Sequence, residues 1–112
     1  MALSFSPPIH PGEILREEYL NPLGLKPYTL AKHLRVPRTR IERLVSEQTS
    51  VTPDTALRLA RFFGTTPQFW MNMQTGYDLA IVSEAKSADL DAIERFANDN
   101  QRGGSATRIA GP

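Results

Sequence analysis

The chain contains no cysteine, which excludes both a disulfide framework and a metal site built from thiolates. No apolar run approaches the ~18 residues that a membrane-spanning helix needs. The first twelve residues, MALSFSPPIHPG, also lack the basic start and apolar stretch of a signal peptide. We therefore expect a cytoplasmic protein with no membrane contact, and its 112 residues are enough for one domain with a modest core.

The net charge of the whole chain is also small, only +1 at pH 7. Taken alone, this value argues weakly against a nucleic-acid partner. The charge is unevenly distributed, however: residues 26–63 hold eight basic and three acidic side chains, a balance of +5. Residues 1–25 and 64–97 carry −2 and −3. The positive field is therefore concentrated in one central stretch, as binding to a phosphate backbone would require.

The polar residues form no group that could run a reaction. His10 and Glu13 have a spacing that two metal ligands could use, but no third ligand follows, and a histidine that caps the first helix is the better interpretation. There is no glycine-rich phosphate loop, and the serines and threonines have no paired base. We expect no enzyme activity, no cofactor, no metal and no small-molecule substrate.

The central stretch 29–48 predicts two short helices around a tight turn. Leu30, Ala31 and Leu34 form the inner face of the first helix, and Pro37 disfavours its continuation through Val36. Ile41, Leu44 and Val45 form the inner face of the second. The outer face of the second helix carries four polar side chains, Arg38, Thr39, Arg40 and Arg43. This pattern is typical of a helix-turn-helix DNA reader.

Helix signals surround this motif, and no β-strand period stands out. A first helix is expected to start near His10 and to end at Asn21-Pro22, where proline interrupts it. Thr52-Pro53 and Thr66-Pro67 each combine a capping hydroxyl with a proline suited to the first helical turn. We predict an all-α protein with a flexible arm (1–9), a helix-turn-helix domain with a dimerisation helix (10–85), a short helix within 86–97 capped by Ser87, and a disordered tail (98–112).

The order of these signals resembles the HigA-type antitoxins, a branch of the Xre/Cro-like helix-turn-helix proteins. The resemblance rests on HPGEILREEYLNPLGL at 10–25, LAKHLRVPRTRI at 30–41 and TPDTALRLARFFGTTPQFWMNMQTGYDL at 52–79. It implies a five-helix Cro/lambda-repressor-like bundle with an extra C-terminal helix, usually a homodimer. Members of the family bind a RelE-like mRNA-cleaving toxin and repress their shared operon, which for a dimer means an inverted-repeat operator.

Three positions depart from the family pattern. Arg35 stands where the turn usually has glycine, and a left-handed conformation there would cost an arginine ~1–2 kcal/mol. Lys26-Pro27 replaces the usual serine cap and its polar neighbour, and Ser46-Glu47 replaces an Asn-Gly pair after the second helix of the motif. Glu47 is expected to lie near the DNA backbone and to repel it. These changes would weaken or retune DNA binding without altering the fold.

The predicted site has three parts. Arg38, Thr39 and Arg43 are expected at base edges, because they lie on the helix that enters the major groove. Backbone contacts are expected from Tyr28, Thr29, Lys32, Arg35, Arg40, Ser46, Gln48 and Thr49. Periodicity alone favours a core role for the apolar residues of 69–81, whereas the resemblance favours a dimer interface made by Phe69, Trp70, Met73, Tyr77 and Ile81.

The expected partners are double-stranded operator DNA, a basic RelE-like toxin and a second copy of the chain. Acidic clusters at Glu13, Glu17 and Glu18 or at Asp89, Asp91 and Glu94 are candidates for toxin capture. Two alternatives stay open: a free-standing repressor without a toxin, and a protein-interaction module that has lost DNA binding. The neighbouring gene and binding to the chain's own promoter would separate these hypotheses.

Overall fold

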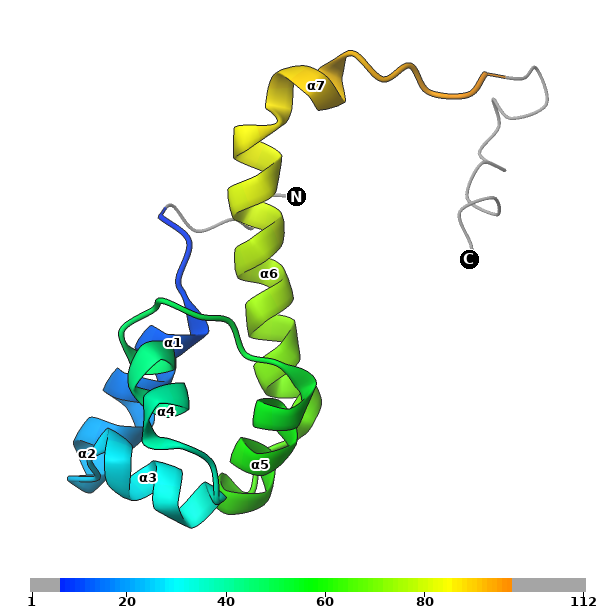
Figure 1. Cartoon of the computed structure of the whole chain (residues 1–112). Coiled ribbons are helices and arrows are strands. Elements are labelled where there is room, and N and C mark those ends of the chain that lie inside the picture. The colour runs from blue at the N-terminus through cyan, green and yellow to red at the C-terminus, as the bar shows by residue number, and fades with distance from the viewer. Residues whose placement is uncertain (1–6, 98–112) are drawn as a thin grey trace.

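The computed structural model of the chain describes residues 7–97, so the tail and most of the arm, both predicted to be flexible, lie outside the described residues. The described residues form helices and no strand (Figure 1). In chain order the elements are α1 (Pro11–Ile14), the π-helix η1 (Leu15–Leu20), α2 (Asn21–Leu23), α3 (Pro27–Leu34), α4 (Arg38–Val45), α5 (Pro53–Phe63), α6 (Pro67–Ala85) and α7 (Ser87–Asp91). The predicted all-α class is confirmed.

The first helix runs through α1, η1 and α2 without a break. His10 caps its start, because the His10 Nδ1 atom accepts a hydrogen bond from the Gly12 N–H at 2.8 Å. The prediction that Asn21-Pro22 ends this helix was wrong, since the helix continues to Leu23 and ends at a left-handed Gly24. The Asn21 N–H bonds five residues back in the wider π turn, and Pro22, which has no N–H, then stands near the start of the last segment.

Local signals at the other helix starts act as the sequence predicts. The Thr52 and Thr66 hydroxyls accept hydrogen bonds from the N–H groups of Thr55 and Phe69, at the starts of α5 and α6. Helix α3 begins after Lys26 without a side-chain cap, as expected. The residue that follows α3, Arg35, has a φ of 62°, so the turn of the motif is the left-handed kind that usually takes glycine.

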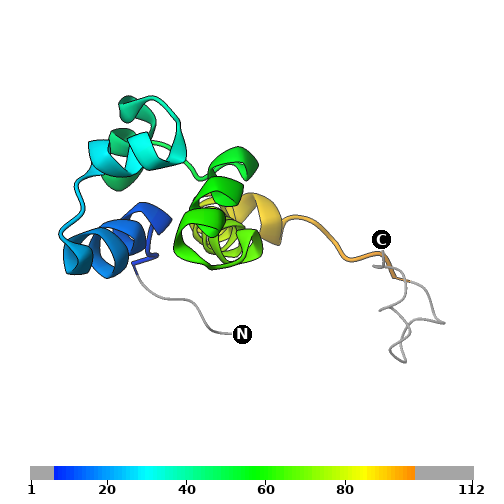
Figure 2. The ribbon, with the colours of Figure 1, turned by 90° about the horizontal axis from the view of Figure 1, so that it is seen from below.

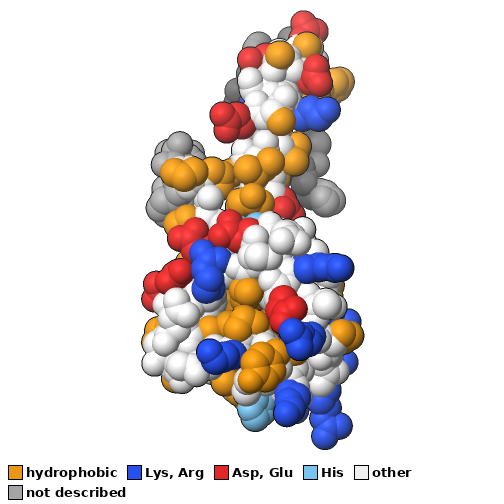
Figure 3. All heavy atoms as spheres, turned by 60° about the vertical axis from the view of Figure 1, so that its left-hand side comes forward, with side chains coloured by type: hydrophobic (Ala, Val, Ile, Leu, Met, Phe, Trp, Pro, Cys, Tyr) orange, Lys and Arg blue, Asp and Glu red, His pale blue; other side chains and the backbone are white. Residues whose placement is uncertain are grey.

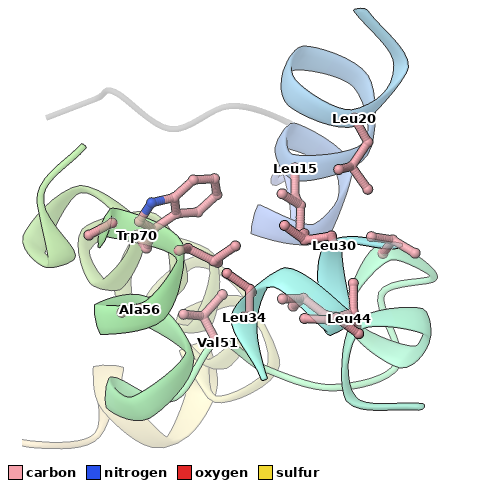
Figure 4. Packing of buried hydrophobic residues seen from close by; sticks show 13 residues of the cluster. Leu15, Leu20, Leu30, Leu34, Leu44, Val51, Ala56 and Trp70 are labelled. Atoms are coloured by element: carbon pink, nitrogen blue, oxygen red, sulfur yellow. The ribbon is translucent and has the colours of Figure 1, made fainter. Parts of the chain in front are cut away.

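The buried core joins the first helix, the α3–α4 pair and the α5–α6 pair (Figure 4). Its labelled members are Leu15, Leu20, Leu30, Leu34, Leu44, Val51, Ala56 and Trp70. Trp70 is fully buried, and its Nε1–H donates to the Thr65 hydroxyl at 2.8 Å. Trp70 therefore has no surface left for a second copy, and its expected place at a dimer interface is replaced by a place in the core.

Helix α6 is only partly covered by the bundle. Figure 2, which looks along this helix, shows the first helix and the α3–α4 pair to one side of it, and in Figure 1 its C-terminal half extends past them. At the covered end, the buried Gln74 accepts a hydrogen bond from the Val51 N–H at 2.8 Å and so fixes the loop before α5. At the projecting end, Leu79, Ile81 and Val82 are exposed. No helix within 7–97 is both long and apolar enough to cross a bilayer.

Helix α7 is shorter than the helix expected within 86–97. It spans Ser87–Asp91, and Ser87 is its first residue and makes no capping hydrogen bond. None of its residues is buried. A helix this short gains little from propensity alone, and with no apolar face packed on the bundle it ends before Ile93 and Phe96.

Candidate nucleic-acid interface

The outer face of α4 presents the three residues expected at base edges. Ile41, Leu44 and Val45 turn into the core, which leaves Arg38, Thr39 and Arg43 exposed on the opposite face. Figure 3 shows most of the visible Lys and Arg side chains on the bundle, whereas the projecting end of α6 with α7 carries mainly apolar and acidic ones. The structure thus places the positive charge on the same bundle as the helix-turn-helix pair.

Two of the arginines on α4 are held by carboxylates. The Arg38 Nε–H donates to Glu42 Oε2 at 3.1 Å, one turn further along the helix. Arg40, expected at a phosphate, instead pairs with Asp54 at the start of α5. Arg43 has no ion pair or hydrogen-bonded side chain among residues 7–97. The three arginine side chains on α4 are therefore restrained to different degrees. Arg40 is paired to another helix, α5, Arg38 is paired within α4, and Arg43 is unpaired within the described residues.

Asp54 is the centre of a cross-link between three helices, and sequence reasoning missed it. Its carboxylate accepts from Arg40 and, at 3.0 Å, from the Nε–H of Arg58. Arg58 also donates to the main-chain oxygen of Leu34, the last residue of α3, at 2.8 Å. The hydrogen bonds from Arg40 and then Arg58 hold the pKa of the Asp54 carboxyl below its ordinary value. The four-residue spacing of Asp54 and Arg58 was visible in the sequence, but their proximity to α3 and α4 was not.

Another arginine, Arg16 of the first helix, contacts the C-terminal end of α4. Its guanidinium donates to the main-chain oxygen of Val45 and pairs with Glu47 at 3.3 Å. It also pairs with Glu17 at 3.0 Å, and the hydrogen bonds to Glu17 and then Glu47 raise the pKa of the Arg16 guanidinium. Glu47 has a φ of 65°, so it occupies a left-handed position where the family usually has glycine. The charge of Glu47 is therefore partly neutralised by a residue that the sequence did not place beside it.

The remaining residues expected at the DNA backbone lie on α3, its turn and the loop after α4. Tyr28, Lys32, Arg35, Gln48 and Thr49 are exposed, and Thr29 is half-buried near the start of α3. Ser46 is exposed, but its hydroxyl already donates to the main-chain oxygen of Glu42 at 2.9 Å. Because α3 and α4 pack on one another, these groups belong to one part of the bundle.

The residues expected at a dimer interface separate into three kinds. Trp70 belongs to the core, and Met73 and Tyr77 are half-buried. The centre of the Tyr77 ring lies 4.8 Å from the centre of the His10 ring. Phe69 and Ile81 keep exposed surface. The capping role expected for His10 is confirmed, and within residues 7–97 no group of three or more His, Cys, Asp or Glu side chains could hold a metal ion.

An all-α bundle whose second motif helix exposes a basic face defines a helix-turn-helix protein of the DNA-binding class. The helix-turn-helix family model matches residues 17–70. Virulence-associated protein I of Dichelobacter nodosus is 56% identical over 82 residues, which cover 73% of this chain and 76% of that protein. Antitoxin HigA-1 of Vibrio cholerae is 36% identical over 72 residues, covering 64% of this chain and 68% of its own.

A solved structure gives the same result. The Pseudomonas aeruginosa antitoxin HigA, determined with the higBA promoter, is 42% identical and superposes with a TM-score of 0.78 over 80% of this chain and 99% of its own. The chain belongs to the HigA-type branch of the Xre/Cro-like helix-turn-helix family. This confirms the resemblance seen in the sequence.

Proposed function

We propose that this chain is the antitoxin of a type II toxin–antitoxin system, which represses its own operon as a DNA-bound homodimer and neutralises a RelE-like mRNA-cleaving toxin. The observation that carries the DNA-binding part is the exposed basic face of α4, backed by the buried Ile41, Leu44 and Val45. The solved relative, a HigA antitoxin determined with promoter DNA, supports DNA binding by this chain.

In the proposed complex, α4 enters the major groove. Arg38 and Arg43 donate to guanine, and Thr39 offers its methyl group or hydroxyl to a neighbouring base. Phosphates are contacted from α3 and its turn by Thr29, Lys32 and Arg35, and from the loop after α4 by Ser46, Gln48 and Thr49. Arg40 can contact a phosphate only if its guanidinium binds the phosphate and Asp54 together or breaks its pair with Asp54. Tyr28 lies beside Arg38.

The projecting half of α6 is the proposed dimer surface. Leu79, Ile81 and Val82 expose apolar area there. Nearer the bundle on the same helix, Phe69 is exposed and Tyr77 is half-buried. Burial of such a surface against a second copy would remove it from water, and a two-fold axis would present two α4 helices to an inverted repeat. Half-site centres would then lie ~34 Å apart, or a multiple of that distance.

An acidic surface is the proposed place for a basic toxin. Glu17 and Glu18 are exposed on the first helix, and Glu13 is half-buried on the same helix. The second candidate cluster, Asp89 and Asp91 with Glu94, is exposed at α7 and beyond it. The two clusters lie on different elements, so charge reversal can test them separately.

Fluorescence anisotropy on the chain's own promoter duplex and on a scrambled duplex tests the DNA-binding part. Native DNA should bind tighter by about 10³-fold or more. Arg43→Ala should cost ~1–3 kcal/mol on native DNA and relax preference at one position per half-site. The control Lys32→Ala should weaken both duplexes alike and flatten the salt slope by about one unit per protomer. Equal binding of parent and variants to both duplexes would contradict the proposal.

Light scattering tests the dimer. The parent should have about twice the mass of the 12.5 kDa chain, and Leu79→Asp with Val82→Asp should lower that mass. Leu23→Asp is the matched control, because Leu23 is equally exposed on α2, away from α6. A parent that stays monomeric at micromolar concentration would overturn the dimer.

Co-expression with the adjacent reading frame tests the toxin. The chain should restore growth, and Glu18→Lys or the pair Asp89→Lys and Asp91→Lys should reduce this rescue. Promoter binding without any toxic neighbour would instead indicate a free-standing repressor. Capture of the neighbour without DNA binding would indicate an interaction module.

A further inference from the structure

The guanidinium of Arg38 is held on two sides although its side chain is 67% exposed. Its Nε–H donates to Glu42 Oε2 at 3.1 Å, and its central carbon lies 6.0 Å from the centre of the Tyr28 ring. The carboxylate belongs to α4 itself, whereas the ring comes from the first turn of α3. Arg38 is thus held to α4 through its Nε–H, which contacts Glu42, and lies against α3 through the Tyr28 ring.

This arrangement leaves a particular part of the guanidinium free. Within residues 7–97 the two terminal nitrogens of Arg38, Nη1 and Nη2, have no hydrogen-bond partner. These two nitrogens form a planar fork, and guanine presents two acceptors, O6 and N7, at a matching spacing in the major groove. An arginine that uses Nε for a carboxylate can still grip guanine end-on with both terminal nitrogens.

We infer that Glu42 and Tyr28 preorder Arg38 to read one guanine in each half-site, and that they determine specificity more than affinity. The inference rests on the proposed DNA-binding function and deepens it. A preordered side chain loses less rotamer freedom when it binds, and this gain applies only where the base offers the matching acceptors. Tyr28 then acts through its ring on Arg38, not through its hydroxyl on a phosphate.

Arg43 provides the internal contrast. It lies on the same exposed face of α4, but within 7–97 it has neither a carboxylate partner nor an aromatic ring beside it. A free arginine can turn toward a base or toward a phosphate, so it discriminates less between sequences. Arg38, held at Nε by Glu42, is restricted in the direction of its fork. Both arginines are proposed to reach guanine from one helix face, and Arg38 should discriminate between sequences more strongly than Arg43.

Glu42 has a second effect because its charge opposes the phosphate backbone. On any sequence, a carboxylate on the DNA-facing helix weakens binding by repulsion. On the correct sequence, its hold on Arg38 offsets that repulsion. Removal of the carboxylate should therefore strengthen non-specific binding and weaken discrimination at the same time. A residue that only stabilised the fold would not produce opposite effects on two duplexes.

Glu42→Gln and Glu42→Ala test this by anisotropy on the native promoter, on duplexes with each G·C pair replaced in turn, and on a scrambled duplex. Discrimination at one guanine should fall about 1.5- to 5-fold, as loss of a weak surface pair implies, while scrambled DNA binds about 2- to 5-fold tighter at low salt. Arg38→Ala should remove discrimination at the same guanine, and Glu42→Ala should add no further loss to it. Glu47→Gln is the matched control, because Glu47 pairs with Arg16: it should change scrambled binding without changing discrimination.

Tyr28 separates a ring contact from a phosphate contact. Tyr28→Phe keeps the ring and should preserve discrimination, whereas Tyr28→Leu should reduce it at the guanine that Arg38 reads. The inference is overturned if the Glu42 variants shift all duplexes equally, if their effect falls on a base that Arg38→Ala leaves unchanged, or if Tyr28→Phe loses as much as Tyr28→Leu. A parent chain that binds native and scrambled DNA alike would refute the proposed function itself, which is a different result.

Discussion

Arg16, on the first helix, donates a hydrogen bond to the main-chain oxygen of Val45, the last residue of α4. The same guanidinium pairs with Glu47 at 3.3 Å, two residues past the helix end. A cation at a helix C-terminus satisfies a free carbonyl and interacts favourably with the negative end of the helix dipole. The first helix thus caps the C-terminus of α4 and supplies a counter-charge for the Glu47 carboxylate that follows it.

A second close approach joins the same two helices and yields the first prediction. A Cβ added at Gly12 would lie 1.9 Å from the main-chain oxygen of Leu44, far inside van der Waals contact. Gly12→Ala should therefore lower the free energy of unfolding by roughly 1–3 kcal/mol, as overpacking does. Urea denaturation checks this.

Gly76 is the matched control for that experiment. It is an exposed helical glycine in α6, and an added Cβ would meet nothing within 4 Å. Gly76→Ala should raise the free energy of unfolding by about 0.5–1 kcal/mol. If the two substitutions changed stability in the same direction, the packing of the first helix on α4 would not be as described.

These contacts show what the sequence could and could not predict. The starts of α5 and α6 were predictable because Thr52 and Thr66 cap residues only three positions away. The link from Arg16 to Val45 crosses 29 positions and comes from the way the first helix packs, which no local pattern encodes. Periodicity places Trp70 on an apolar face, but it cannot distinguish a core face from a subunit interface.

Arg35 gives the second prediction, because it holds a left-handed conformation at the end of α3 with a φ of 62°. Glycine adopts this conformation without a steric penalty, so Arg35→Gly should raise the free energy of unfolding by about 0.5–1 kcal/mol. Arg35→Ala removes the same charge but keeps the Cβ, so it should give no such gain. Thermal and urea unfolding of both variants make the comparison, and equal stabilities would show that the turn is unstrained.

The acid dependence of stability gives the third prediction, through Asp54. Because Arg40 and Arg58 hold the pKa of this carboxyl below the ordinary 3.8, the folded state favours the charged form. Its contribution is present above the ordinary pKa and is lost as the pH falls through the lower folded value. Asp54→Asn should therefore be less stable than the parent at neutral pH and match it in strong acid. The difference should shrink in high salt, because Asp54 is half exposed.

Glu84→Gln is the control for this titration, since Glu84 is exposed on α6 and lies in no ion pair within the described part of the chain. Its stability relative to the parent should be nearly independent of pH. A similar acid-dependent loss in both variants would mean that general charge repulsion, and not the Arg40–Asp54–Arg58 cross-link, governs acid unfolding.

The last prediction returns to Arg16 and Glu47 and rests on the proposed DNA binding, in which their pairing should determine how strongly Glu47 repels DNA. With Arg16 in place, Glu47→Gln should tighten binding to any duplex only slightly, and most at low salt, where screening is weakest. Arg16→Gln should leave Glu47 unpaired and weaken binding, and the double variant should recover most of that loss. Salt titrations by anisotropy on native and scrambled DNA measure all three. If Arg16→Gln weakened binding equally with and without the Glu47 carboxylate, Arg16 would act on DNA directly, or only by capping Val45.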